Sequence, residues 1–337
     1  MSDIKLAQAE LQALLSQALQ HHRTSPANAD SVAQALAQAQ CDGQVGHGVS
    51  RINSYCLQAQ AGKVNGMAAP AIIAQTEAAV RIDAAHGFAF PAIDLAIETL
   101  SRKASQQGIA CATITRSHHF GVAGWHVERL AAQGMVGLIL GNSPAAIAPY
   151  GGAKPLFGTN PIAFAAPRTN AEPLVIDLSL SKVARGKVMV AAKEGRSIPE
   201  GWGLDADGTP TTDPNAVLAG SMLAMGDAKG GALVLMVEIL AAALTGANFG
   251  FEASSFFDDK GDPPGVGQTL LCFNPQLLSG GQFAQRLQTL IDAILEQDGT
   301  RLPGTKRLEM RATAKAEGVS VSETLYQELR ALVDKTN

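Results

Sequence analysis

Residues 109–140 read IACATITRSHHFGVAGWHVERLAAQGMVGLIL, and this stretch decides the fold class. Short apolar residues from Ile109 to Thr115 and from Val136 to Leu140 predict two strands. Helical spacing predicts a helix over 120–133 between them. The turn after the first strand lacks G-x-G-x-x-G, and neither that motif nor a P-loop occurs elsewhere in the chain. The stretch therefore predicts an α/β architecture without a Rossmann fingerprint.

Short strands and helices continue to alternate on both sides of this stretch. Ala79–Asp83 alternates like a strand, and 92–107 has helical spacing. Ile162–Ala165 and Leu174–Ile176 predict two more strands. Thr269–Phe273 predicts a late strand that returns to the same sheet. The middle of the chain is therefore expected to form one mixed α/β domain.

The two ends of the chain have helical spacing instead. Residues 3–41 predict two amphipathic helices, and the second begins with Ser25 as N-cap and Pro26 in its first turn. A glycine-rich segment over 42–66 is expected to be mostly loop around one short helix. Further helices are predicted at 184–194, 229–244, 283–296 and 322–333.

The composition favours a globular protein of the cytoplasm. Of the 337 residues, 46% are hydrophobic and 17% charged, the net charge is −4, and no long Lys/Arg cluster suggests nucleic acid as a partner. The longest apolar stretch, 232–244, contains Glu238 and is shorter than the ~20 residues of a membrane span. The N-terminus lacks a signal-peptide pattern. Four cysteines without a CxxC pair are expected to stay reduced.

The first candidate site is the segment Asp42–Arg51, DGQVGHGVSR. His47 lies between two glycines, whose backbone lets a ligand approach closely. Arg51 follows four residues later, so a helix that begins between them would turn both side chains toward one pocket. A histidine can deliver a proton near neutral pH, and an arginine can hold a carboxylate with two hydrogen bonds. The alternative is a loop histidine bonded to backbone beside a solvated arginine.

The second candidate site is Arg116–Trp125, RSHHFGVAGW, where the first strand turns into a helix expected to open at Gly121. Polar substrates and anions bind at such helix starts. Adjacent side chains point different ways, so at most one of His118 and His119 is expected to face the site. The alternative is a capping serine beside a packed histidine. No carboxylate or thiol completes a metal set with these histidines and His126, so no metal site is expected.

Four further segments could contact a nucleotide. Phe157–Ile162 and Asp177–Ser181 offer hydroxyls and backbone NH groups that suit phosphate or ribose. Lys229 stands at a helix start, where a cation fits the helix dipole poorly unless a phosphate, a carboxylate or Asp227 lies beside it. Leu302–Arg307 is a turn with two adjacent cations. Each of these turns has the alternative of being an ordinary solvated turn.

Seven segments, taken in order, carry a resemblance to a known family. They are Gly46–Gly48 with Arg51, Ser117–Gly121, Phe157–Pro161, Asp177–Ser179, Pro199–Trp202, Lys229–Gly230 and Leu302–Gly304. Together they resemble the malate/L-lactate dehydrogenase family, which includes sulfolactate, ureidoglycolate and diketogulonate dehydrogenases and the reductases of Δ1-piperideine-2-carboxylate and Δ1-pyrroline-2-carboxylate. The resemblance covers nearly the whole chain, and the ordered set carries it rather than any single motif.

The resemblance implies a mixed α+β subunit with a non-Rossmann cofactor domain on a mostly antiparallel sheet. This cofactor domain would comprise 71–180 and 247–274. An N-terminal helical region, 1–70, would be joined by C-terminal helices within 275–337, and 181–246 would form a small helical domain. The resemblance also implies an obligate homodimer with the site near the interface.

The resemblance further implies hydride transfer from a nicotinamide cofactor to C2 of a small 2-oxo or 2-imino acid. His47 matches the family's proton donor, although some members assign the proton to the histidine that matches His119. Arg51 would hold the substrate carboxylate, and Thr159 is a second expected substrate contact. The cofactor would supply the redox chemistry, and the protein would supply position and charge.

The expected cofactor is NADPH or NADH, bound by residues from several of these segments. NADPH is favoured because two adjacent cations in the 302–307 turn suit its 2′-phosphate. The expected contacts are Ser143, Asp177, Leu178, Ser179, Lys229, Gly230, Pro303, Gly304, Thr305, Lys306 and Arg307.

The chain departs from the family's pattern at two positions. Gly46 stands where the family usually has serine, and Lys187 stands where the cyclic-imine reductases have the aspartate of a Ser-His-Asp relay. These departures favour a 2-oxo acid substrate of the malate, lactate or sulfolactate type. The first alternative is a cyclic-imine reductase. The second is a non-catalytic dimer that binds a nucleotide, which the missing serine suggests.

Overall fold

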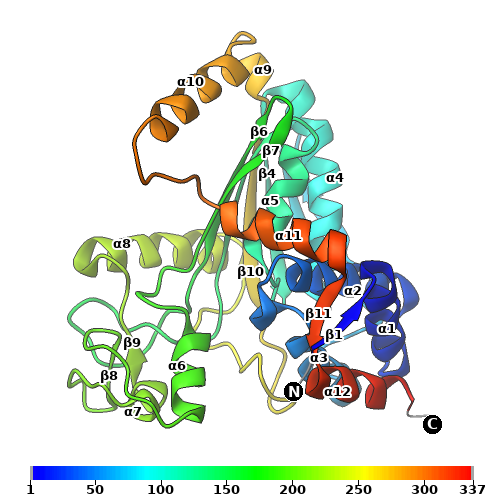
Figure 1. Ribbon diagram of the computed structural model, residues 1–337. Helices are drawn as coiled ribbons and strands as arrows, with labels where there is room; N and C mark the ends of the chain where they lie inside the picture. The colour runs from blue at the N-terminus through cyan, green and yellow to red at the C-terminus, as the bar shows by residue number, and fades with distance from the viewer. Residues whose placement is uncertain (1–2, 335–337) are drawn as a thin grey trace.

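A seven-stranded sheet forms the centre of the protein in the computed structural model, which describes residues 3–334 (Figure 1). All neighbouring strands are antiparallel except β3 and β4, which are parallel. The prediction of a mostly antiparallel sheet is confirmed, and the late strand does return to the sheet. The strand order is β2 (Ala71–Gln75), β3 (Ala79–Asp83), β4 (Ile109–Ser117), β10 (Val266–Phe273), β5 (Val136–Gly141), β6 (Ile162–Arg168) and β7 (Ala171–Leu178).

Helices α4 (Ala89–Gln107) and α5 (Ala123–Ala131) pack against this sheet and bury its apolar core. Helix α5 begins later than the sequence predicts. Gly121 has a φ of +68°, and Val122 is extended at the N-cap position. The residues before the helix therefore stay in a loop beyond the end of β4, which leaves His119 outside regular structure.

A second core lies among the helices from the two ends of the chain. These are α1 (Gln8–His21), α2 (Pro26–Cys41), α3 (Ile52–Ala61) and α12 (Glu323–Val333). The predicted cap at Ser25 is confirmed, because its side chain accepts a hydrogen bond from the backbone NH of Asn28. The sequence did not reveal the small sheet in which β1 (Asp3–Leu6) pairs with β11 (Val319–Ser322).

The C-terminal helices do not all pack on this second core. Helix α11 (Thr305–Glu317) contacts α2 and β11, whereas α9 (Pro275–Leu278) and α10 (Phe283–Leu295) lie toward the other end of the sheet (Figure 1). The amphipathic pattern of α10 predicts a covered apolar face. In the single chain only Ile291 of this helix is buried, and Leu290 is 59% exposed.

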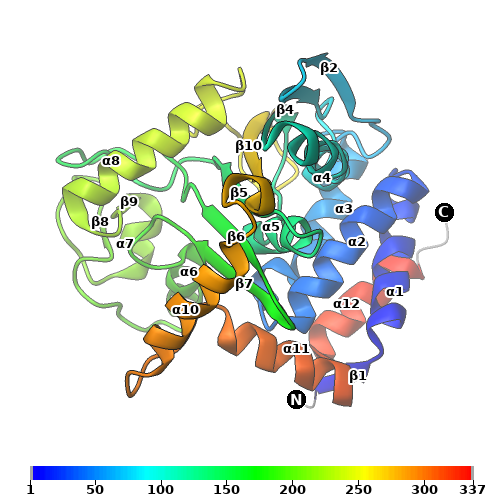
Figure 2. The same ribbon diagram turned by 90° about the horizontal axis from the view of Figure 1, so that it is seen from above.

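The small helical part lies beside the sheet, as the view in Figure 2 shows. Its helices are α6 (Arg185–Lys193), α7 (Pro214–Ala219) and α8 (Asp227–Glu238), with the short strands β8 (Gly203–Leu204) and β9 (Ser221–Met222). The long helix begins two residues before its predicted start. It continues into a π-helical turn, η3 (Ile239–Ala243).

Candidate active site

His47 and His119 lie side by side, although they come from distant parts of the chain. His47 ends the 3-10 helix η1 (Val45–His47), and His119 lies just beyond the end of β4. Their rings are stacked, with centroids 5.3 Å apart and planes inclined by 15°. Both candidates for the proton donor therefore belong to one site.

The two glycines beside His47 differ in whether a side chain would fit at their position. A Cβ on Gly48 would collide with Gln40 of α2, whereas a Cβ on Gly46 would meet nothing within 4 Å. The Gln40 side chain accepts a hydrogen bond from the NH of Val49 and donates one to the carbonyl oxygen of Ser320. Helix α2 thus fixes the loop behind Gly48. Gly46 leaves open space beside the histidine.

Arg51 borders the same site from the 3-10 helix η2 (Val49–Arg51). Its Nε donates to the carbonyl oxygen of Gly46 at 2.7 Å, and its guanidinium lies 4.7 Å from the ring centroid of Phe257. No residue within 3–334 hydrogen-bonds its two terminal nitrogens. These nitrogens remain available for the two oxygens of a carboxylate.

Burial keeps both histidines neutral in the free protein. Burial first, and then the charge of Arg51, lowers the pKa of His47 from 6.5 to about 4. The pKa of His119 is also held well below 6.5, by burial first and then by Arg51 and His47. A carboxylate bound to Arg51 would offset the smaller of these two causes, the positive charge beside His47, and would raise the pKa of His47. An acidic substrate can therefore help to protonate His47.

Tyr55 of α3 is a member of the site that the sequence analysis missed. Its side chain is fully buried, and its hydroxyl lies 2.5 Å from Nδ1 of His119. The neighbouring His118 is buried against the other side of this cluster, with its ring 5.9 Å from that of Tyr55 and its Nε2 2.8 Å from Oε1 of Gln58. The spacing of Tyr55, four residues after Arg51, was the available signal, because such residues share one helical face.

A loop that precedes β10 packs against His119. The ring centroid of Phe256 lies 5.2 Å from that of His119. Lys63, whose side chain is 1% exposed, anchors this loop, since its Nζ donates to the carbonyl oxygens of Ser255 at 2.7 Å and Asp258 at 3.0 Å. The anchored loop provides an apolar wall that keeps water from one side of the site.

Ser143 and Thr159 lie next to each other behind the end of β5. The NH of Thr159 donates to Oγ of Ser143 at 3.1 Å. A Cβ on Gly158 would collide with the backbone of Ser143, so the two segments can approach this closely only because residue 158 is glycine. The structure thus joins two residues that the sequence analysis assigned separately to cofactor and substrate.

Glu238 holds these segments together from α8. Its carboxylate is buried and accepts hydrogen bonds from Nδ2 of Asn160 at 2.7 Å, Nδ2 of Asn142 at 3.2 Å and the NH of Gly250 at 2.7 Å. Burial raises the pKa of Glu238 even though these donors oppose the shift. One carboxyl group therefore connects the segments beside β5 and β6 with the loop that precedes β10.

The expected cofactor residues at the end of β7 are accessible. Asp177 accepts a hydrogen bond from the NH of Gly124, at the first turn of α5, at 2.8 Å. Leu178 is 45% exposed, and the hydroxyl oxygens of Ser179 and Ser181 lie 2.7 Å apart. This edge offers an apolar surface next to hydroxyl groups, which suits a nucleotide.

The expected cofactor turn near the C-terminus lies beside a small cavity. The cavity has a volume of about 170 Å³ and is lined by Pro303 and Thr305 together with Leu174 of β7. Gly304 has a φ of +84° and precedes the first turn of α11. The predicted turn is therefore shorter than 302–307, because Thr305 already belongs to a helix that the sequence analysis did not identify.

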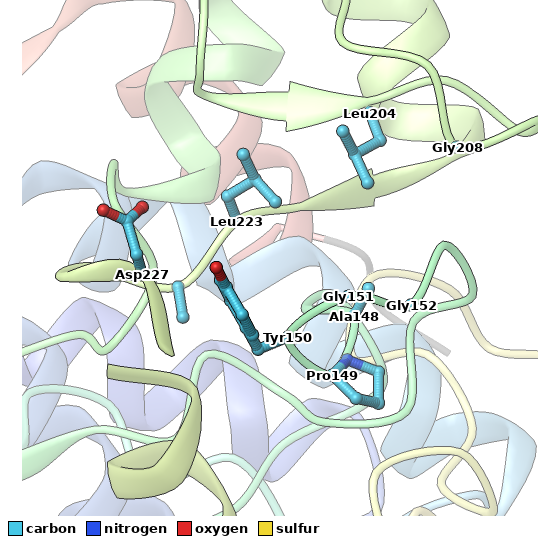
Figure 3. A pocket seen from close by; sticks show the side chains of 10 residues that line it. Ala148, Pro149, Tyr150, Gly151, Gly152, Leu204, Gly208, Leu223 and Asp227 are labelled. Atoms are coloured by element: carbon cyan, nitrogen blue, oxygen red, sulfur yellow. The ribbon is translucent and has the colours of Figure 1, made fainter. Parts of the chain in front are cut away.

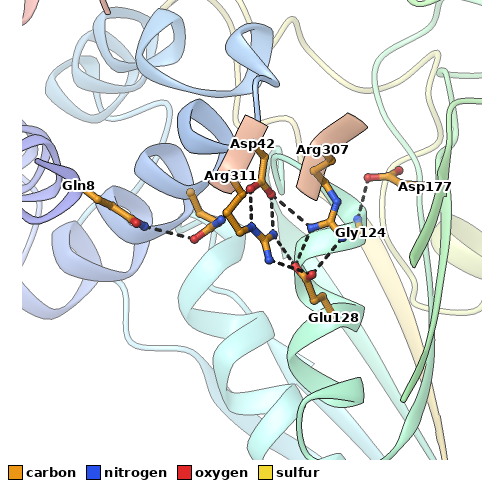
Figure 4. Close-up of polar contacts among 8 residues, drawn as sticks. Gln8, Asp42, Gly124, Glu128, Asp177, Arg307 and Arg311 are labelled. Atoms are coloured by element: carbon orange, nitrogen blue, oxygen red, sulfur yellow. Dashed lines mark hydrogen bonds and ion pairs between the residues drawn. The ribbon is translucent and has the colours of Figure 1, made fainter. Parts of the chain in front are cut away.

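The two cations of this segment, Lys306 and Arg307, have different surroundings, and Figure 4 shows those of Arg307. Arg307 pairs with Glu128 at 2.8 Å and with Asp42 at 3.3 Å, and Arg311 contacts the same two carboxylates. Lys306 is exposed and has no ion pair within residues 3–334. Lys306 is thus the better placed of the two for a phosphate, since the guanidinium of Arg307 is already engaged.

Lys229 and Gly230 lie in the first turn of α8. Lys229 is exposed, and a Cβ on Gly230 would collide with the carbonyl oxygen of Met225. A cavity of about 260 Å³ opens nearby and is lined by Tyr150 and Asp227 among others (Figure 3). A helix start beside a cavity suits a phosphate group.

Neither a metal centre nor a membrane span is present in residues 3–334. No group of three or more His, Cys, Asp or Glu side chains there could hold a metal ion. Across the same part of the chain, every helix is too short or too polar to cross a membrane.

Sequence comparisons identify two kinds of relative, a dehydrogenase of a 2-hydroxy acid and a reductase of cyclic imines. A family model for malate/L-lactate dehydrogenase matches residues 6–330. A (2R)-3-sulfolactate dehydrogenase (NADP(+)) of Chromohalobacter salexigens is 52% identical over 303 residues, which is 90% of this chain and 90% of that relative. A Δ1-pyrroline-2-carboxylate/Δ1-piperideine-2-carboxylate reductase of Pseudomonas putida is 45% identical over 329 residues, which is 96% of this chain and 95% of that relative.

Similar solved structures also include both kinds of enzyme. The Δ1-piperideine-2-carboxylate reductase of Pseudomonas syringae pv. tomato has a TM-score of 0.93 and 41% identity, and the match covers 98% of this chain and 99% of that one. A sulfolactate dehydrogenase from Methanocaldococcus jannaschii has a TM-score of 0.91 and 28% identity, and the match covers 98% and 97%. The non-Rossmann fold inferred from the ordered motifs is confirmed.

Proposed function

This chain belongs to the malate/L-lactate dehydrogenase family, and on that premise we propose that it reduces the C2 carbonyl of a small 2-oxo acid to a hydroxyl group. It is an NAD(P)-dependent oxidoreductase of 2-oxo or 2-imino acids. The observation that carries the proposal is the position of Arg51, whose free terminal nitrogens lie beside the stacked pair of His47 and His119. This arrangement suits a carboxylate next to a reducible carbon.

In the proposed mechanism the side chains of this site bind the acid and move one proton. Arg51 holds the carboxylate, which fixes the position of C2. His47 protonates the substrate oxygen, and His119 donates a hydrogen bond to that oxygen. The loop with Phe256 and Phe257 excludes water. General acid catalysis of this kind contributes typically ~10²–10⁴-fold to the rate.

A nicotinamide cofactor fits the chain and supplies the hydride when bound. The candidate contacts are the accessible edge Asp177–Ser179, the helix start Lys229–Gly230 and the turn Pro303–Thr305, with Ser143 behind the site. Pro303 and Thr305 line one cavity, and Asp227, two residues before Lys229, lines another. We propose a preference for NADPH, with Lys306 at the 2′-phosphate. The name of the 52% identical relative, which specifies NADP(+), supports this preference.

The 2-oxo acid branch is preferred over the cyclic-imine branch for two reasons. The sulfolactate dehydrogenase is the more similar of the two sequence relatives described above. The family resemblance places Lys187, an exposed residue of α6, where cyclic-imine reductases have a relay aspartate. The second candidate function is cyclic-imine reduction, favoured by the TM-score of 0.93 and by the apolar wall at Phe256 and Phe257. The non-catalytic dimer is rejected, because the named relatives are enzymes.

We also propose that the enzyme works as a homodimer in the cytoplasm. Helix α8 and its extension present an uncovered apolar face, with Leu235 47%, Ile239 50% and Leu244 56% exposed. Such a patch is typical of a subunit interface. The four cysteines are free thiols, which suits a reducing compartment.

A substrate panel tests the proposed reaction. NADPH and NADH oxidation would be followed with pyruvate, oxaloacetate, 3-sulfopyruvate, Δ1-piperideine-2-carboxylate and Δ1-pyrroline-2-carboxylate. We expect the highest kcat/KM with NADPH and one of the three 2-oxo acids. A cyclic imine that exceeds every 2-oxo acid by about tenfold, ~1.4 kcal/mol in transition-state binding, would move the assignment to the second candidate.

A further inference from the structure

Tyr55 and His119 form a buried pair whose geometry limits where protons can be. The Tyr55 hydroxyl lies 2.5 Å from Nδ1 of His119, and no other hydrogen-bond partner for it is present in residues 3–334. The ring of Tyr55 is enclosed by Phe88, Phe90 and the neighbouring His118, so water does not replace that partner. A buried hydroxyl without an acceptor is costly.

We propose that Tyr55 is a positioning residue that holds His119 as the neutral tautomer with its proton on Nε2. A phenol that donates to Nδ1 requires Nδ1 to be unprotonated, because a ring nitrogen that carries a proton cannot accept one. Burial raises the pKa of Tyr55 far above 10, so its hydroxyl keeps its proton at neutral pH. Because the buried hydroxyl has no other acceptor in residues 3–334, it donates its proton to Nδ1, and Nδ1 stays unprotonated.

The charges around His119 reinforce this state. Arg51 and His47 face it from the glycine loop, His118 adjoins it in sequence, and His126 approaches it from α5. Lys63 adds a positive charge near His118. No carboxylate is among the groups that affect the pKa of His119. Every neighbouring charge thus disfavours an imidazolium at His119.

This tautomer divides the work between the two histidines, an inference that rests on the proposed function. Nε2–H of His119 can polarise the C=O bond by donating a hydrogen bond, but releasing that proton would leave an imidazolate. A bound dihydronicotinamide would supply the hydride from its own C–H bond, and the carbonyl oxygen, which gains the π electrons, would take its proton from the His47 imidazolium. His47 is then neutral and regains a proton from solvent. A neutral histidine thus acts as electrophile and a charged one as acid.

Nitrogen NMR of the whole enzyme, labelled with ¹⁵N at its histidines, tests the tautomer directly. In the wild type we expect His119 to show a protonated Nε2 and an unprotonated Nδ1 from pH 8 down to pH 5.5. In Tyr55→Phe we expect a mixture of tautomers. The matched control is Tyr326→Phe, which removes a hydroxyl in the helical core around α12 and leaves the His119 signals unchanged. A wild-type signal with protonated Nδ1, or one that titrates near pH 6.5, overturns the proposal even if the variant fails to fold.

Kinetics provide the second readout. We expect Tyr55→Phe to lower kcat about tenfold while the KM for the acid changes less than threefold, because Arg51 still binds the carboxylate. An unchanged kcat together with an unchanged tautomer would contradict the role of Tyr55. If no 2-oxo or 2-imino acid is reduced but the NMR response is as expected, the proposed function fails and the positioning of His119 by Tyr55 stands.

Discussion

Arg307 and Glu128 are joined by two parallel hydrogen bonds, from Nη1 to Oε2 at 2.8 Å and from Nη2 to Oε1 at 3.0 Å. Arg311 and Asp42 complete a cluster in which two cations meet two anions (Figure 4). Asp42 is the C-cap residue of α2 and lies just before the loop of His47. The cluster therefore ties α11 and the turn before it to α5 and to the loop that contains His47.

We predict that Glu128→Gln destabilises the protein by about 3 kcal/mol at pH 7, because loss of one partner leaves buried guanidinium charge uncompensated. Burial alone would raise the pKa of Glu128, but hydrogen bonds from Arg311 and Arg307 outweigh it and set the pKa below 4.5. This carboxyl thus stabilises the fold above pH 4.5, and its contribution is lost as the pH falls through its folded-state pKa.

Urea denaturation at several pH values checks this prediction. The control is Glu317→Gln, which breaks an exposed pair with Lys5 and should change the free energy of unfolding by less than about 0.5 kcal/mol. Equal effects for the two variants at pH 7, or a Glu128→Gln effect that grows as the pH falls below 4.5, would contradict the role given to the cluster.

Lys306→Ala should weaken NADPH binding about tenfold and leave NADH binding nearly unchanged, since a charge-assisted hydrogen bond contributes roughly 1.5 kcal/mol or more. Arg307→Ala should instead lower thermal stability, because Arg307 pairs with Glu128 and Asp42. Fluorescence titration with both cofactors measures the ratio. The same loss for NADPH and NADH in Lys306→Ala would show that Lys306 is only solvated.

Arg51→Lys should raise the KM for the acid far more than it changes cofactor affinity. The lysine offers one point charge in place of two parallel donors, and it loses the packing of the guanidinium on Phe257. Steady-state kinetics and a cofactor titration measure the two effects separately. A KM that stays within about threefold, near RT in free energy, would mean that Arg51 does not hold the carboxylate.

The sequence predicted those helices and strands whose formation depends on residues close together in the chain. The alternation at Ala79–Asp83 and the cap at Ser25 appear in the structure as expected. The pairing of Asp3 with Ser322 was missed, because two short strands from opposite ends of the chain leave no local trace of their register. Helix α11 was missed because it follows Gly304 and has no buried residue that would create an apolar stripe.

Site residues that are close in sequence could be predicted together. Contacts between residues that are distant in sequence could not. The spacing of His47 and Arg51 suggested one pocket but left a solvated loop as the alternative, and the ordered motifs added His119. The stacking of the two rings arises from tertiary structure. The role of Glu238 was signalled only by a charge inside an apolar stretch, and its three partners come from separate loops.

The division of roles between His47 and His119 is the central claim, and the kcat of His47→Asn tests it most directly. We expect kcat for reduction of the best 2-oxo acid to fall by two or more orders of magnitude, on the ~10²–10⁴-fold scale of general acids, with NADPH affinity largely intact. His119→Asn should lose less kcat, because it removes only a hydrogen bond. A His47→Asn enzyme that keeps most of its kcat, beside an inactive His119→Asn enzyme, would contradict the account and make His119 the acid.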